Sequence, residues 1–114
     1  MHEMSYVVRF ADMAMEAVEN EPDAVIEKIT VEVGAMTGVL PEYLIKYYPE
    51  AVAGTRLEGS VLEIESRPVV ARCSACGSEY GPSASNDYKC PDCGSAEATI
   101  IHGRELNLLR VSIK

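Results

Sequence analysis

Residues 73–94, CSACGSEYGPSASNDYKCPDCG, decide how the chain folds, because they carry all four cysteines as two spaced pairs. Each pair has two residues between its cysteines and a glycine after the second, as in Cys73–Gly77 and Cys90–Gly94. This spacing lets both sulfurs of a pair face one ion, and the glycine permits the sharp turn that follows. The pattern predicts a single metal site with four thiolate ligands, which are Cys73, Cys76, Cys90 and Cys93.

Four thiolates in a tetrahedral array suit Zn(II), with iron as the other candidate. We expect zinc in a structural role, because four protein ligands leave no open position for a water molecule. The thirteen residues between the pairs are slightly fewer than is usual in a zinc ribbon. They are polar and rich in glycine and serine, which predicts a loop that depends on the metal for its stability.

Two other uses of such cysteine pairs compete with a structural zinc site. Rubredoxins bind iron for electron transfer with the same CxxCG and CPxCG turns, but here most of the chain lies outside the cysteine segment. Zinc ribbons also bind nucleic acid. The formal net charge of −8 disfavours that function, and only Arg67, Arg72 and Lys89 lie close by in the sequence.

Outside the cysteine segment, three stretches alternate in the way that half-buried strands do. They are residues 25–33, 60–66 and 106–114. The simplest packing is an α+β fold, in which two helices cover one face of a small three-stranded sheet. The four-cysteine zinc-ribbon-like module is inserted before the last strand of that sheet. We therefore expect two domains: an α/β domain made of residues 1–67 together with 101–114, and a zinc-binding domain at 68–100.

Two segments have the spacing of amphipathic helices. Residues 5–19 place Val7, Phe10 and Ala14 on one side. A second helix begins at Pro41, which suits a first helical position, and we expect Pro49 to kink it or end it early.

The composition excludes several classes of protein. No stretch approaches eighteen consecutive apolar residues, and no basic region followed by an apolar run opens the chain, so we expect a cytoplasmic protein without a membrane span. In that reducing compartment cysteines are more often metal ligands than disulfides. We find no catalytic triad, no phosphate-binding glycine loop and no nucleotide motif, so we do not expect an enzyme.

The chain as a whole resembles the HypA family of nickel-insertion accessory proteins for nickel-iron hydrogenase maturation. The resemblance runs from end to end and rests on the two CxxC pairs together with four further stretches. These are MHEMS at 1–5, VEVGAMTGVLPEYL at 31–44, AGTRLEGSVLEIE at 53–65 and GRELNLLRVSIK at 103–114. Pro49 departs from the family pattern, in which the second helix usually continues.

The resemblance implies a nickel metallochaperone with two metal sites. Ni(II) would be cargo bound at Met1, His2 and Glu3, and Zn(II) would be structural at the four cysteines. The family passes nickel onward with a partner GTPase of the HypB family to a hydrogenase large-subunit precursor. Any nucleotide hydrolysis would come from that partner. The competing hypothesis is a zinc-ribbon interaction module that binds protein or nucleic acid and ignores nickel.

The chemistry of the N-terminus is consistent with nickel. The amine of Met1, the backbone nitrogen of His2 and its imidazole can form two fused chelate rings, a nearly planar set that Ni(II) or Cu(II) favours. The Glu3 carboxylate or backbone nitrogen can take the fourth position. Taken alone, a histidine so near a terminus is usually just exposed to solvent.

Two further expectations concern the rest of the chain. We interpret His102, the other histidine, as a surface residue at a turn rather than a ligand. An exposed edge of the sheet would also allow two copies to associate as a homodimer.

Overall fold

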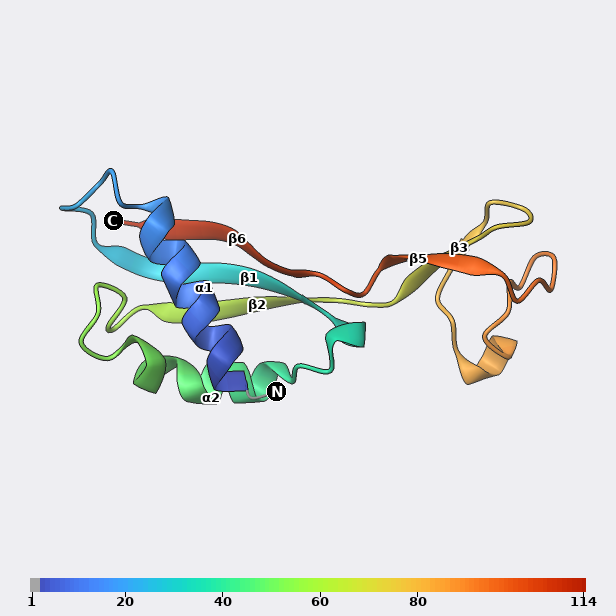
Figure 1. Cartoon of the computed structure of the whole chain (residues 1–114), viewed down its shortest axis with the longest axis horizontal. Coiled ribbons are helices and arrows are strands. Elements are labelled where there is room, and N and C mark those ends of the chain that lie inside the picture. The colour runs from blue at the N-terminus through green and yellow to red at the C-terminus, as the bar shows by residue number, and fades with distance from the viewer. Residues whose placement is uncertain (1–2) are drawn as a thin grey trace.

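The computed structural model describes residues 3–114 and shows an elongated molecule that measures 55 × 26 × 18 Å. Two three-stranded sheets lie at its two ends and are joined by a narrow neck (Figure 1). The larger end contains both helices, and the smaller end contains the cysteine segment. No helix within the described range is long and apolar enough to cross a membrane.

The larger sheet has the strand order β2-β1-β6, formed by Val61–Arg67, Ile26–Gly34 and Leu106–Ile113. Strand β1 pairs in parallel with β2 and antiparallel with β6. The helices α1, Glu3–Ala17, and α2, Pro41–Val52, cover one face of this sheet (Figure 1). This arrangement confirms the predicted α+β fold.

The core of this end lies between the sheet and the two helices. Apolar side chains alternate along β1, so that Ile29, Val31 and Val33 are buried while Glu32 is only partly covered. The buried residues of the cluster are Val7, Phe10, Ala11, Ala14, Val18, Ile26, Ile29, Val31, Val33, Val39, Leu44, Tyr48, Val52, Leu57 and Leu62.

Helix α1 begins and ends two residues earlier than the predicted range of 5–19. The chain beyond the end of α1 is held by the guanidinium of Arg56. It donates hydrogen bonds to the backbone carbonyls of Val18 (3.0 Å), Ala24 (2.9 Å) and Glu21. The carbonyls of Val18 and Glu21 also accept backbone N–H groups of the turn, from Glu21 at 2.9 Å and Ala24 at 3.1 Å, so the guanidinium joins three carbonyls of one turn. Arg56 therefore holds the turn between α1 and β1 in place.

Replacing Arg56 by methionine should destabilise the protein, because the carbonyls of this turn lose three hydrogen bonds while the apolar length of the side chain is kept. We expect a loss of about 1–2 kcal/mol in the free energy of unfolding, measured by urea denaturation. Arg9→Met is the matched control, since Arg9 is exposed and makes no side-chain hydrogen bond within residues 3–114. Equal losses in both variants would contradict this role.

Of the two predicted effects of Pro49, an early end of the second helix is wrong, because α2 continues to Val52, and a kink stays a prediction. Pro49 cannot donate the backbone hydrogen bond of its position, which weakens the last turn. Tertiary contacts compensate for that loss. Tyr48 and Val52 are buried in the core, and the Tyr48 hydroxyl lies 2.6 Å from the Ser60 hydroxyl.

The alternation expected along 106–114 is broken by a bulge in β6. Thr30 pairs with Arg110 and Val31 pairs with Leu108, so Leu109 is an extra residue in the ladder. As a result Leu108 and Val111 both pack against the core, although strict alternation would place them on opposite faces.

The second sheet was not predicted, because the cysteine segment was expected to be a loop around a metal. It has the strand order β4-β3-β5, formed by Glu79–Tyr80, Val70–Cys73 and Ala98–His102. The expected loop contains β4 and a short 3-10 helix, η2, at Ala84–Asn86. These pieces are short and weakly patterned, so periodicity alone does not reveal them.

The neck consists of two chain segments, Arg67–Val70 and His102–Leu106, that are fastened to the end of β1. The backbone N–H of Gly34 donates to the carbonyl of Glu105 at 2.7 Å. The backbone N–H of Met36 donates to the carbonyl of Gly103, also at 2.7 Å, and Met36 belongs to the short 3-10 helix η1 at Ala35–Thr37. The backbones of Gly34 and Gly103 approach so closely that a Cβ on Gly34 would lie 2.1 Å from the Gly103 oxygen.

Replacing Gly34 by alanine should therefore force the neck away from β1, since the obstacle is backbone and not a flexible side chain. We expect a loss of roughly 2–4 kcal/mol in the free energy of unfolding. Gly81→Ala is the matched control, because the added Cβ there has one neighbour, the Val69 oxygen at 3.7 Å, and should change stability little. Similar denaturation midpoints for the two variants would show that the close approach is not a constraint.

Candidate metal centre

The two cysteine pairs form two turns with the same backbone hydrogen bonds. Gly77 donates its N–H to the carbonyl of Cys73 at 2.9 Å, and Gly94 donates to that of Cys90 at 2.8 Å. Both glycines are left-handed, with φ values of 80° and 77°, as the sequence pattern predicts for a sharp turn after the second cysteine. The first turn follows β3, so the sheet fixes its position.

The turns bring the four sulfur atoms together, with every pair within 4.8 Å. The Cys73 and Cys93 sulfurs are 3.5 Å apart, and those of Cys76 and Cys90 are 3.6 Å apart. A zinc ion with bonds of about 2.3 Å to four sulfurs holds them about 3.8 Å apart, whereas a disulfide requires about 2.05 Å. The sulfur positions fit a tetrahedral metal site and not a pair of disulfides.

The ionisation of these thiols shows why the cluster suits a cation. Hydrogen bonds from Ser78 lower the pKa of the Cys76 thiol to about 6, and the backbone N–H of Cys76 lowers that of Cys73. The Ser95 backbone amide lowers the pKa of Cys93, but the neighbouring sulfurs, first that of Cys73, raise it to about 12. Repulsion between neighbouring sulfurs opposes the ionisation of all four thiols, and a bound cation would offset that repulsion.

Little apolar packing supports the cluster. The smaller core consists of Ala71, Cys73, Tyr80 and Cys90, with Ile100 packed against it. The other two cysteines, Cys76 and Cys93, are exposed. A core of this size cannot stabilise a domain by itself, so the fold of this end depends on what the sulfurs bind.

The predicted nickel residues are placed only in part. Met1 and His2 lie outside the described residues. Glu3 is the first residue of α1, at the end of the molecule that carries the larger sheet (Figure 1). Its carboxylate is at the positive end of the helix dipole, where an acidic side chain is favourable. Glu3 is therefore not part of the sulfur cluster, which consists of the four cysteines alone within the described residues.

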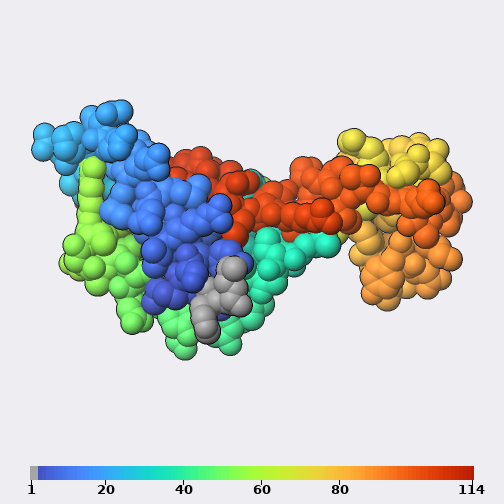
Figure 2. All heavy atoms as spheres, in the orientation of Figure 1, coloured from blue at the N-terminus to red at the C-terminus, as the bar shows by residue number. Residues whose placement is uncertain are grey.

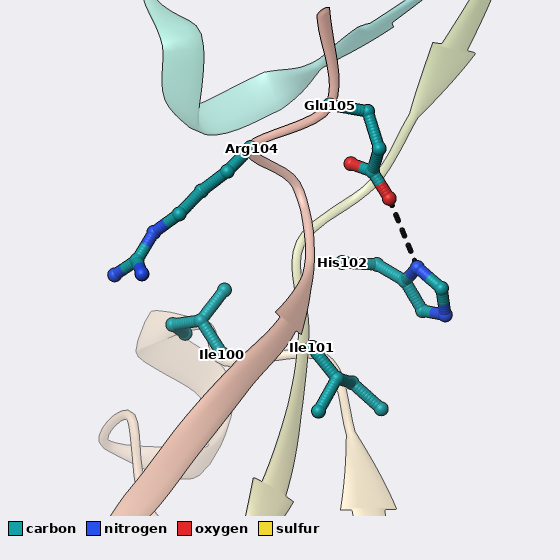
Figure 3. A pocket seen from close by; sticks show the side chains of 5 residues that line it. All are labelled: Ile100, Ile101, His102, Arg104 and Glu105. Atoms are coloured by element: carbon teal, nitrogen blue, oxygen red, sulfur yellow. Dashed lines mark hydrogen bonds and ion pairs between the residues drawn. The ribbon is translucent and has the colours of Figure 1, made fainter. Parts of the chain in front are cut away.

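His102 lies at the end of β5, in the neck, and its side chain is 57 % exposed. Its Nδ1 atom is 2.9 Å from the Glu105 carboxylate, which also accepts the backbone N–H of Gly103 at 2.6 Å (Figure 3). These two hydrogen bonds lower the pKa of Glu105, with that from Gly103 contributing most. His102 is a surface residue at a turn, as predicted. Glu105 was not predicted as a partner of His102, although it lies three residues further along the chain.

Ion pairs stiffen the base of the neck on the open face of the larger sheet. Arg67 lies 2.9 Å from the Glu32 carboxylate and 3.0 Å from that of Glu65. Two hydrogen bonds lower the pKa of the Glu32 carboxyl. The one from Asn107 has the larger effect and the one from Arg67 the smaller. Glu32 and Arg67 also line a pocket of about 490 Å³, together with Pro68, Val70, His102 and Glu105.

The fold and the sulfur cluster define a two-part metal-binding protein, in which an α/β domain carries a separate four-thiolate module. The chain belongs to the HypA family, whose model, described as hydrogenase/urease nickel incorporation metallochaperone, matches residues 1–113. It is therefore a nickel metallochaperone of hydrogenase maturation, which confirms the family predicted from its sequence.

Similar chains with a curated description carry the name hydrogenase maturation factor HypA. That of Thermomicrobium roseum is 33 % identical, with the alignment covering 100 % of this chain and 98 % of the relative. That of Desulfosudis oleivorans is 35 % identical, with 100 % and 99 % covered. That of Streptomyces avermitilis is 35 % identical, with 97 % and 86 % covered.

Two solved structures share the fold. The solution structure of the Ni metallochaperone HypA from Helicobacter pylori has a TM-score of 0.68 and 23 % identity, with 99 % of this chain and 97 % of that one covered. A second solution structure of a HypA protein has a TM-score of 0.75 and 22 % identity, with 100 % and 97 % covered.

Proposed function

We propose that this chain carries Ni(II) as transferable cargo at Met1, His2 and Glu3 and holds Zn(II) structurally at its four cysteines. The observation that supports a division of labour is the separation of the two donor sets. Glu3 begins α1 in the part of the molecule that carries the larger sheet, whereas the four sulfurs cluster in the part that carries the smaller one. A change of metal at one site therefore need not disturb the ligands of the other.

The donor chemistry assigns a different metal to each set. Four thiolates in a tetrahedron favour Zn(II) and close its coordination, which suits a structural ion. An amine, a backbone nitrogen and an imidazole favour the planar geometry of Ni(II). A site built from three consecutive residues at a chain end encloses the ion little, so a partner can remove the ligands one at a time.

The two metal sites correspond to two proposed domains. The nickel-binding domain comprises residues 1–67 together with 101–114, and the zinc-binding domain comprises 68–100. The first supplies the cargo site on the end of α1. The second is a rigid body of fixed shape when its metal is bound, and it gives a partner a second surface to contact.

Delivery requires partners, since the role of a metallochaperone is to bind and release its metal rather than to catalyse a reaction. We propose that a GTPase of the HypB family supplies the energy for release, and that the acceptor is a hydrogenase large-subunit precursor. The phosphate chemistry is assigned to the GTPase because no phosphate-binding glycine loop occurs in this sequence.

A transfer assay tests this proposal. The nickel-loaded chain is mixed with a HypB-family GTPase, GTP and a metal-free large-subunit precursor, and nickel in the re-isolated precursor is measured by mass spectrometry. We expect nickel to reach the precursor from the natural chain and not from His2→Ala, while both retain zinc. Equal transfer by both chains would contradict the nickel site. Zinc binding without any nickel transfer would favour a zinc-ribbon interaction module.

A further inference from the structure

The two cysteine turns lie at the surface of the smaller end of the molecule. Cys76 and Cys93, the second cysteine of each turn, are exposed, whereas Cys73 and Cys90 are buried. The residues directly before and after the exposed cysteines are exposed as well. The neck separates this end from the helices, which leave it uncovered on the face in view (Figure 2). A small solute such as a peroxide can therefore reach one sulfur of each turn.

Each exposed sulfur is in contact with a buried sulfur of the other turn. The Cys76 sulfur lies 3.6 Å from that of Cys90, and the Cys93 sulfur lies 3.5 Å from that of Cys73. A disulfide bond is about 2.05 Å long, so each pair would close by a small further movement of the side chains. Two sulfur pairs thus run between the turns, and each has one accessible and one buried member.

Two hydrogen bonds hold the turns side by side independently of the sulfurs. The Ser78 hydroxyl, just after the first turn, donates to the Asp92 carboxylate within the second turn at 2.5 Å. The backbone N–H of Ser74, within the first turn, donates to the carbonyl of Glu97, which follows the second turn, at 3.0 Å. These contacts keep the two turns together while their sulfurs react, which favours disulfides between the turns over disulfides within one turn.

We propose that the four cysteines are a reversible oxidation site for peroxides, at which the disulfides Cys76–Cys90 and Cys73–Cys93 form between the two turns. This oxidation site rests on the proposed function, since the reduced cluster holds the four thiolates as zinc ligands. The spacing alone predicts the other pairing, because two cysteines in a CxxC motif commonly close a disulfide with each other. The oxidised chain has no thiolate left to hold zinc, and two covalent bonds then join the turns in place of the ion.

The chemistry consumes one peroxide for each disulfide. The exposed thiolate attacks one oxygen of hydrogen peroxide, the O–O bond breaks, and a sulfenic acid forms on the cysteine as hydroxide leaves. The buried thiolate of the other turn attacks the sulfenic sulfur, so that an S–S bond forms, the S–O bond breaks and a second hydroxide leaves. Protons from the solvent convert both hydroxides to water. Each pair of thiolates is thus oxidised by two electrons, and the peroxide is reduced to water.

Treatment of the zinc-loaded chain with hydrogen peroxide tests the proposal. Zinc release is followed with a coloured chelator, and the oxidised chain is digested with trypsin without reduction. Trypsin cuts after Arg72, Lys89 and Arg104. The first cysteine pair is therefore in peptide 73–89 and the second is in peptide 90–104. We expect the bound zinc to be released and the two peptides to be joined by disulfides.

Two further measurements define the product. Fragmentation of the joined peptides assigns the partners, and we expect Cys76 to be bonded to Cys90 and Cys73 to Cys93. Addition of a dithiol reductant together with zinc should restore the free thiols and the original metal content, because the disulfides reopen by thiol exchange.

Replacing Ser78 by alanine tests why the bonds form between the turns. The variant loses the hydrogen bond to Asp92, so the ratio of joined to separate peptides should fall by about threefold or more. Ser74→Ala is the matched control, since Ser74 contacts Glu97 through its backbone N–H and this variant keeps that bond. The control should give the same ratio as the natural chain.

Four outcomes would overturn the proposal. They are full zinc retention at a peroxide concentration that oxidises free cysteine, two separate peptides that each contain an internal disulfide, oxidation that a dithiol does not reverse, or equal ratios of joined peptides in Ser78→Ala and Ser74→Ala. None of these results bears on the proposed metal sites. A chain that binds no zinc before peroxide is added would overturn the proposed zinc site as well, so the two failures are distinguishable.

Discussion

Adding one glycine before Met1 should lower the affinity for Ni(II) by about a hundredfold or more, while zinc content stays unchanged. The extension keeps His2 and Glu3 but moves the free amine away, so that the chelate ring between amine and backbone nitrogen is lost. Isothermal titration of zinc-loaded protein at neutral pH measures the effect. The natural chain should bind one Ni(II) tightly.

The matched control carries one glycine after Lys114, which adds the same residue at the other end of the chain. This variant should bind nickel like the natural chain. Affinity should also rise with pH in the natural chain, because the amine and the imidazole must lose protons before they bind metal. Equal affinities of the two extended variants would mean that the amine is not a ligand and that nickel binds elsewhere.

Replacing Cys90 by serine should remove the metal from the sulfur cluster and unfold the second sheet. Cys90 is 2 % exposed and belongs to the small core, so its loss removes both a ligand and packing. The core that remains is too small to hold β3, β4 and β5 together without metal. We expect the zinc content, measured by atomic emission, to fall from one ion per chain to a small fraction of that. In NMR spectra the amide signals of residues 70–102 should lose their chemical-shift dispersion.

Ser74→Ala is the matched control for this variant, because Ser74 is exposed between two cysteines and its structural contact is a backbone hydrogen bond to Glu97. It should retain one zinc. Acidification should release the metal from the natural protein as the thiolates take up protons, and the sign follows from the need for all four to be deprotonated. Full zinc retention in Cys90→Ser would contradict the four-thiolate site.

The larger domain could be predicted from the sequence because its strands and helices are long and clearly patterned. Residues 25–33 alternate cleanly, and β1 forms at 26–34 with the expected face buried. The errors arose where tertiary contacts outweigh local rules. The buried neighbours of Pro49 carry α2 past it, and the bulge at Leu109 changes which side of β6 faces the core.

The clustering of the four cysteines was predictable, because the spacing within each pair lets both sulfurs face one point. The second sheet was not, since β4 has two residues and β5 has five, too few for periodicity to register. The close approach of Gly34 to Gly103 was also beyond prediction. It joins residues 69 positions apart in the sequence, and nothing local in either stretch indicates the contact.

The strand order of the larger sheet has a consequence for how the chain is made. Central strand β1 pairs Ile29 with Val111, so the sheet lacks its third strand until residues 106–113 have left the ribosome. The whole cysteine segment is synthesised first, and it stands between β2 and β6 as an insertion. When that segment folds around its metal, it brings the ends of these two strands together and shortens the loop that β6 must close. Early metal capture at one end of the molecule should therefore speed the completion of the other.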